Sequence, residues 1–170
     1  MASLKIFLKR INWRQILVHF LAAWPIIYAF KLLSVFSDIS IFKLFIPGNK
    51  PEFLQAMNEG QVSLVAFTRY VYVTSTFGFW GYLLAFLISL TISFRRHWHW
   101  ANSIIASLGI YIIYQNPLGR KYTTGWHSTI YPNPIPTSIF WHIVTAGLCL
   151  AVGFWLFFSR HANNFIGQTA

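Results

Sequence analysis

Two histidines and two arginines lie close together in the stretch RRHWHWANS, which begins at residue 95. His97 and His99 could share a metal ion, because imidazole is a common metal ligand. Side chains two residues apart point in different directions on a helix, so only an extended turn would let both rings reach one ion. The long apolar segments of the chain are expected to cross a membrane, and His19 and His161 are then expected on the same side of it as His97 and His99. One hypothesis is therefore that these four imidazoles bind zinc, or that two of them bind haem iron.

The same stretch has a second interpretation, a tight turn between two apolar segments at the membrane surface. Arginine side chains reach lipid phosphates from such a turn, and tryptophan rings favour the membrane interface. No cysteine, aspartate or glutamate is expected on that side to complete a metal site. We therefore favour the turn, predict no metal or cofactor, and expect lipid contacts from Arg95, Arg96, Trp98 and Trp100.

Catalytic chemistry has few residues to draw on. The chain has three carboxylates, Asp38, Glu52 and Glu59, and all three fall in one predicted loop. A carboxylate proton relay inside the membrane, or an acid and base pair from two segments, is therefore not expected. His127 and the adjacent Ser128 could resemble a base and its nucleophile, but neighbouring side chains diverge. The sequence favours a protein that is not an enzyme.

Composition indicates a membrane protein. Hydrophobic residues make up 56% of the chain and charged residues only 9%, too few to cover a water-soluble surface. The formal net charge of +10 could indicate nucleic acid binding, but the 13 lysines and arginines mark the ends of apolar blocks. Anionic lipid headgroups are therefore the expected counter-charge, and no nucleic acid partner is expected.

The predicted fold is all-α: a single membrane domain over residues 1–170, formed by a polytopic bundle of four transmembrane helices. The predicted spans cover residues 16–36, 70–94, 98–114 and 139–158, each judged from its length and apolar character. A short amphipathic helix is predicted in the first outer loop, where Asn49 could cap a turn that contains Pro51 and Glu52. Small or polar residues expected to let helices pack closely are Ser103, Ser107, Ala146, Gly147 and Gly153.

The positive residues also predict an orientation. With the N-terminus inside, Arg95 and Arg96 fall in a very short inner turn, whereas the outer loops are long. Short loops are the ones in which positive charge marks the inner side of a membrane. We therefore expect both termini in the cytoplasm and the chain in the plasma (inner) membrane.

The second outer loop is longer than a simple connection requires. Arg120, Tyr122, Trp126 and Tyr131 in this loop are the predicted contacts to a partner protein, because arginine and aromatic residues are enriched in interfaces. An outer aromatic belt of the membrane protein is an equal alternative for these residues.

These features favour a non-catalytic accessory or scaffolding subunit that binds a partner protein in the membrane. A small transporter or channel component, with Lys31 or Arg69 near its path, is the first alternative. A haem- or metal-binding membrane protein that uses the inner histidines is the second alternative.

Overall fold

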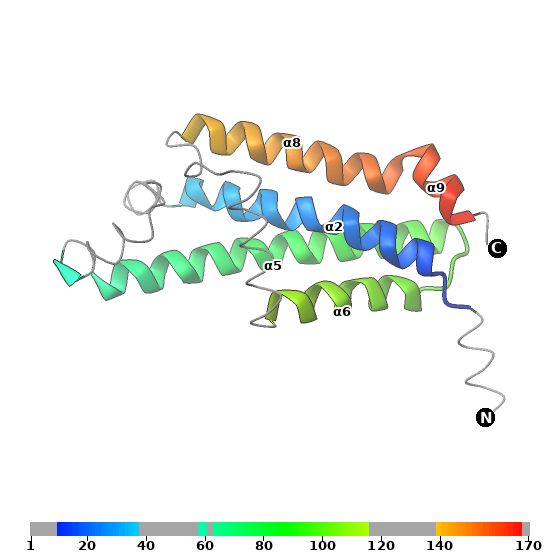
Figure 1. Cartoon of the computed structure of the whole chain (residues 1–170), viewed down its shortest axis with the longest axis horizontal. Helices are drawn as coiled ribbons and strands as arrows, with labels where there is room; N and C mark the ends of the chain where they lie inside the picture. Colours follow the sequence, from blue (N-terminus) through cyan, green and yellow to red (C-terminus); the bar gives the residue numbers. More distant parts are fainter. Residues whose placement is uncertain (1–9, 38–57, 61–62, 116–138, 168–170) are drawn as a thin grey trace, which may run out of the picture.

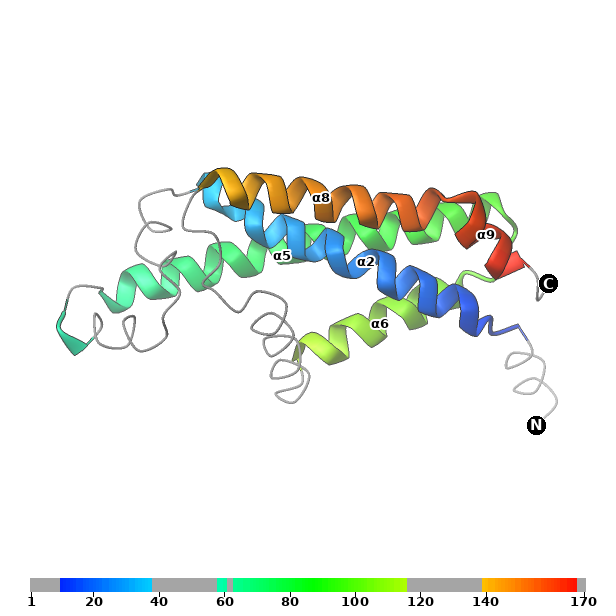
Figure 2. The ribbon, with the colours of Figure 1, turned by 45° about the horizontal axis from the view of Figure 1, so that its top comes forward.

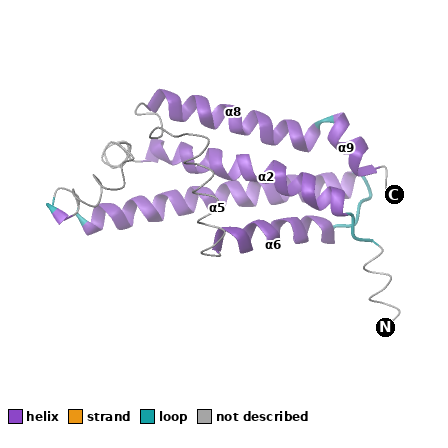
Figure 3. Cartoon of the chain, viewed as in Figure 1, coloured by secondary structure: helices purple, strands orange, loops and turns teal. Residues whose placement is uncertain are grey.

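The computed structural model describes residues 10–37, 58–60, 63–115 and 139–167, and within these ranges the chain forms helices and no strands (Figure 3). The elements in chain order are α2 (Trp13–Leu33), the 3-10 helix η1 (Ser34–Ser37), α5 (Leu64–Arg95), α6 (Ala101–Gln115), α8 (Ile139–Phe158) and α9 (Arg160–Gly167). The four long helices lie side by side and alternate in direction, while the short α9 turns off at one end of the bundle (Figure 1). The all-helical part of the predicted fold is thus confirmed.

Helix α2 is the centre of the bundle. It packs against α8, α5 and α6, and Figure 2 shows α8 and α6 on opposite sides of it. Asn12 begins the helix, because its side-chain oxygen accepts a hydrogen bond of 3.1 Å from the backbone N–H of Gln15. This bond satisfies one of the N–H groups that the first helical turn leaves unpaired. Ala22, Ala23 and Ile26 are buried on α2, and the small side chains let its neighbours approach closely.

Two helices meet α2 at glycines. A Cβ atom added to Gly153 of α8 would lie 2.5 Å from Ile26 Cγ1 and 2.9 Å from the carbonyl oxygen of Ala22. A Cβ atom added to Gly81 of α5 would lie 2.9 Å from the Cα atom of Ile27. These separations are shorter than the contact distance between carbon atoms of about 3.5 Å, so only glycine fits at either contact without a shift of the helices.

The small residues predicted on α8 do not all share one role. Ala146 is fully buried against the α2 side, which together with Gly153 confirms the expected close packing of this helix. Gly147 instead is exposed, and nothing lies within 4 Å of the position that its Cβ atom would take. Helix α8 therefore has one small-residue surface that is occupied and another that is open.

The observed helices differ from the predicted spans mainly at their ends. Helix α8 has the predicted bounds, whereas α2 begins before residue 16 and α5 extends from Leu64, beyond the predicted start at residue 70. The third helix begins at Ala101 and not at residue 98, because the preceding tryptophans belong to a turn. Hydropathy alone counts those tryptophans as part of the apolar segment. The predicted amphipathic helix of the first outer loop lies almost wholly outside the described residues.

Two stretches, Trp13–Ser37 and Leu64–Arg95, are long and apolar enough to cross a membrane. A third crossing is possible if Ile143–Phe158 and Arg160–Gly167, which meet at a bend of 41°, act as one broken span. Helix α6 has 15 residues, and its length of about 22 Å is less than the hydrocarbon core of about 30 Å. The described helices therefore support two or three crossings, fewer than the four predicted.

Candidate functional site

One end of the bundle brings together the start of α2, the turn between α5 and α6, and helix α9 (Figure 1). We call this region the polar end; it comprises residues 10–19, 89–103 and 159–167. The Asn12 side-chain amide donates a hydrogen bond of 3.0 Å to the carbonyl oxygen of Ile166. Arg14 Nη1 donates to the carbonyl oxygen of Phe165 at 3.3 Å, and the guanidinium lies 4.8 Å from the centre of the Phe165 ring. These contacts hold α9 against the start of α2.

The turn between α5 and α6 is built by a left-handed residue, His97. Its backbone φ is 56°, and its N–H donates to the carbonyl oxygen of Phe94 at 3.2 Å. The next N–H, that of Trp98, donates to the carbonyl oxygen of Ser93 at 2.9 Å. This pair of bonds is the Schellman arrangement, in which a left-handed residue ends a helix and satisfies its last carbonyl groups. The tight turn predicted here is confirmed, and the His97 ring is exposed on it.

His99 starts the next helix. Its Nδ1 atom accepts a hydrogen bond of 3.3 Å from the backbone N–H of Ala101, the first residue of α6. Its ring is stacked on that of Trp100, with 5.7 Å between the ring centres. His99 thus satisfies a backbone donor that the helix start would otherwise leave unpaired.

A buried hydrogen-bond network joins three helices just inside the polar end. Asn102 of α6 accepts from the Asn12 backbone N–H at 3.1 Å and donates from its Nδ2 atom to Gln15 Oε1 at 2.9 Å. Gln15 in turn donates from Nε2 to the hydroxyl oxygen of Ser93 on α5 at 2.6 Å. Gln15, Asn102 and Ser93 are each at most 1% exposed. Such groups are costly to bury unless they are paired, so the network fixes the relative positions of α2, α5 and α6.

The direction of the hydrogen bonds around Ser93 follows from its single proton. The Ser93 hydroxyl donates to the carbonyl oxygen of Ser89 at 3.0 Å, and a hydroxyl has one hydrogen to donate. The 2.8 Å bond between the hydroxyls of Ser93 and Ser103 must therefore be donated by Ser103. Ser103 was expected to support close helix packing, and it does so as a buried hydrogen-bond donor.

His19 lies one turn deeper than Gln15, away from the solvent. Its Nδ1 atom forms a hydrogen bond of 2.7 Å with the Ser89 hydroxyl, whereas its buried Nε2 atom has no hydrogen-bond partner in the described chain. The ring packs edge-on against Phe157 of α8, with 5.3 Å between ring centres. It also lines a small cavity of about 10 Å³, together with Tyr82 and Ser107. This volume is close to the smallest that a water molecule can occupy.

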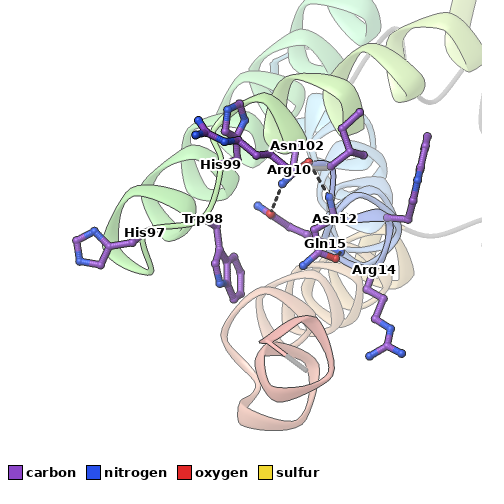
Figure 4. A pocket seen from close by; sticks show the side chains of 10 residues that line it. Arg10, Asn12, Arg14, Gln15, His97, Trp98, His99 and Asn102 are labelled. Atoms are coloured by element: carbon purple, nitrogen blue, oxygen red, sulfur yellow. Dashed lines mark hydrogen bonds between the residues drawn. The ribbon is translucent and has the colours of Figure 1, made fainter. Parts of the chain in front are cut away.

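A wider cleft of about 590 Å³ opens at the polar end between the start of α2 and the α5–α6 turn (Figure 4). The buried amides of Gln15 and Asn102 line it. Figure 4 shows the Arg14 side chain pointing away from these amides on one side and the His97 ring pointing away on the other. The remaining side chains that line the cleft belong to Arg10, Ile11, Asn12, Trp13, Trp98 and His99.

The four histidines proposed for a metal occupy separate positions. His19 is inside the bundle, His97 is exposed on the turn, His99 bonds the start of α6, and His161 is exposed on α9. Within the described ranges, no group of three or more His, Cys, Asp or Glu residues is arranged to hold a metal ion. Only His97 and His99 of this set line the same cleft.

The residues predicted to contact lipid all lie on or beside the turn at the polar end. Arg95, Arg96 and Trp100 are exposed, as a surface contact requires. Trp98 is partly buried, and the Arg96 guanidinium lies 5.6 Å from its ring centre, which is a cation–π arrangement. The predicted partner contacts Arg120, Tyr122, Trp126 and Tyr131 lie outside the described residues.

Lys31, named for a possible transport path, lies toward the other end of α2. Its side chain covers Gly78 of α5, where an added Cβ atom would lie 2.7 Å from Lys31 Cε. Arg69 is exposed near the start of α5. These two cations belong to the part of the bundle away from the polar end.

Sequence reasoning missed Gln15 and the two serines of α5 as parts of a site. A signal was present, because Gln15 and His19 are four residues apart in one apolar helix, and so are Ser89 and Ser93 in another. Residues at this spacing lie on the same helical face, so each pair forms a polar strip along an apolar helix. Two such strips in different helices indicate a shared buried contact.

Comparisons with protein-family models, with curated proteins and with solved structures find no match to this chain. The structure itself defines the class: an all-helical chain in which two or three segments are able to cross a membrane, with a buried polar network at one end.

Proposed function

We propose that this chain is a non-catalytic integral membrane accessory or scaffolding subunit that binds a partner protein through the exposed side of α8. The observation that carries the proposal is the pair Gly147 and Ala151, which are exposed and one helical turn apart. Exposed small residues at this spacing allow a second helix to approach the backbone closely in a membrane. Leu148, Val152 and Trp155 are also exposed on α8 and would pack beside such a helix.

The side of α8 that packs on α2 supports the proposal that the exposed side of α8 binds a partner helix. Ala146 and Gly153 already let α8 pack tightly on α2, so close approach through small residues is how this helix makes contacts. The residues of the buried hydrogen-bond network at the polar end support a structural role as well. They are mainly amides and hydroxyls whose hydrogen bonds fix helix positions, rather than groups aimed at a reacting atom.

We further propose that the chain crosses the plasma (inner) membrane four times, with the polar end in the cytoplasm. Both ends of the described chain lie at the polar end, together with the α5–α6 turn (Figure 1). Arg10, Arg14, Arg95, Arg96 and Arg160 gather there, which is the charge distribution of a cytoplasmic side. Helix α6 is short for a crossing and would require local thinning of the bilayer.

Protection of a tag at each terminus from external protease in intact cells tests this orientation, and cleavage of either tag would contradict it.

Photo-crosslinking tests the partner interface. A photo-reactive amino acid is placed at position 147 or 151 of the full chain in native membranes, and at the exposed Leu108 of α6 as the control. We expect a discrete protein adduct from α8 and none from α6. Adducts with lipid alone would contradict the proposal, and an adduct only with a second copy of this chain would contradict the accessory role.

Substitution of the small residues provides the complementary test. The protein identified by crosslinking should no longer co-purify with the variant that combines Gly147→Leu and Ala151→Leu, because the larger side chains hold a second helix away. The free energy of unfolding of the isolated chain should not fall, since both positions are exposed. Retention of the partner by this variant would contradict the proposed interface.

A further inference from the structure

The cleft at the polar end has a strongly positive lining. Arg10 lies just before α2 and Arg14 lies in the first turn of α2, with its side chain at the outer edge of the cleft, and His99 lines the cleft from the α5–α6 turn (Figure 4). None of the residues that line the cleft, all within the described ranges, carries a carboxylate. The cleft therefore attracts an anion, and arginine is the side chain that best matches the oxygens of a phosphate group.

The base of the cleft is rigid as well as polar. Gln15 and Asn102 line it and are fixed by hydrogen bonds to each other and to α5. Arg14 is held in place by the Phe165 carbonyl oxygen and ring. Because these groups are already ordered, an anion that binds here does not have to fix them, which reduces the entropy lost on binding.

An apolar strip leads away from the same cleft along α2. Trp13 lines the cleft and is 70% exposed, and it is followed at intervals of four residues by Leu17, 54% exposed, and Leu21, 50% exposed. Residues at this spacing lie on one face of a helix. A positive cleft that continues into an exposed apolar strip matches a molecule with an anionic group attached to a hydrocarbon chain.

The surroundings place this cleft at the level of lipid headgroups. Trp13 and Trp100 are exposed at this end of the bundle, and tryptophan favours the membrane interface. Phe165 of α9 is a further aromatic residue that is exposed at this end.

We propose that the cleft is a binding site for one anionic phospholipid, whose phosphate lies between the start of α2 and the α5–α6 turn and whose acyl chain follows Trp13, Leu17 and Leu21. This site differs from the exposed turn arginines, which face the general lipid surface. It does not depend on the proposed partner interface of α8, so either proposal can fail while the other holds.

Lipid titration of the full-length protein, followed by native mass spectrometry, tests the site. The probes are phosphatidylglycerol, which is anionic, and phosphatidylcholine, which has no net charge. We expect one tightly retained phosphatidylglycerol and weaker retention of phosphatidylcholine. Arg10→Gln combined with Arg14→Gln should weaken phosphatidylglycerol binding about 25-fold, since each cation near an anionic headgroup strengthens binding about fivefold.

The matched control removes two positive charges at the same end but outside the cleft. Arg95→Gln combined with Arg96→Gln should leave the tightly bound phosphatidylglycerol in place. An equal loss of phosphatidylglycerol binding in both double variants would show general surface attraction and overturn the proposal. Unchanged binding in the Arg10 and Arg14 double variant would overturn it as well. Thermal unfolding of each variant checks that it is folded.

Two further arms distinguish a lipid from a free anion. Leu17→Gln combined with Leu21→Gln should weaken phosphatidylglycerol binding, because it makes the acyl strip polar without changing the charge of the cleft. Inorganic phosphate at millimolar concentration should not displace the lipid. Displacement by phosphate, or full binding by the Leu17 and Leu21 variant, would show an anion site without lipid specificity and overturn the assignment.

Discussion

The side-chain oxygen of Gln15 accepts a hydrogen bond of 2.9 Å from the side-chain amide of Asn102, which lies 87 positions later in the chain. Through this bond the first helix of the bundle is joined to the third, and Gln15 continues the connection to Ser93 of the second. In a membrane the hydrophobic effect does little to hold helices together, so hydrogen bonds and close packing between helices set the arrangement. The network therefore has a measurable role in stability.

Replacement of Gln15 tests that role. Gln15→Leu leaves the Asn102 amide and the Ser93 hydroxyl without one buried partner each, and we expect a loss of about 2 kcal/mol in the free energy of unfolding in detergent. Gln15→Leu combined with Asn102→Leu should cost less than the sum of the two single substitutions, because both ends of one bond are then apolar. A loss in the double variant that equals or exceeds the sum of the two single losses would contradict a stabilising contact between the pair.

The two histidines of the turn should respond in opposite directions to glycine. His97 has a φ of 56°, a conformation that glycine adopts at little cost. We therefore expect His97→Gly to raise the free energy of unfolding by about 1 kcal/mol. His99→Gly should lower it, because it removes the ring nitrogen that accepts from the Ala101 N–H. Chemical unfolding monitored by circular dichroism measures both changes, and destabilisation by His97→Gly would contradict this reading of the turn.

The turn also shows how far the sequence could predict a site. A tight reversal at about Arg95 to His97 was correctly predicted, since basic and aromatic residues interrupt two apolar segments there, and the structure extends the turn to Trp100. The roles of its histidines could not be predicted from their spacing. The left-handed backbone of His97 and the hydrogen bond that His99 makes to α6 decide where each ring points, and both depend on how the helices meet.

The helices themselves were predictable where apolar character alone defines them. Helix α8 has the predicted bounds, and Gly153 has the predicted packing role. The network between Gln15 and Asn102 was not predicted, because the choice of partner across 87 positions is made by tertiary packing. Hydropathy also assigned Trp98 to the third helix, although the residue lies in the turn before it.

The two kinds of glycine on α8 give a sharp comparison. Gly153→Ala would place a methyl group 2.5 Å from Ile26 Cγ1 and 2.9 Å from a backbone oxygen of α2. We expect a loss of about 2 kcal/mol, as for an overpacked core. Gly147→Ala meets open space and should raise stability by up to about 1 kcal/mol, because alanine favours the helix over glycine. Unfolding in mixed micelles measures both, and equal effects of the two substitutions would contradict the observed packing of α8 on α2.

Ser89 provides the last test, because it is the hydrogen-bond partner of a buried histidine. Ser89→Ala removes the hydroxyl that lies 2.7 Å from His19 Nδ1, and the Nε2 atom of that ring already has no partner within the described chain. We expect a loss of about 1 to 3 kcal/mol in the free energy of unfolding, the cost of leaving a buried polar group unpaired. Thr91→Ala is the matched control on the same helix, since Thr91 is exposed and its hydroxyl donates to the Leu87 carbonyl oxygen at 2.7 Å, within its own helix. Serine and threonine have similar helix preferences, so both substitutions change helix preference by a similar amount. A difference in the free energy of unfolding between the two variants therefore isolates the contact with His19. Equal stability of the two variants would show that this contact does not help to hold α2 against α5.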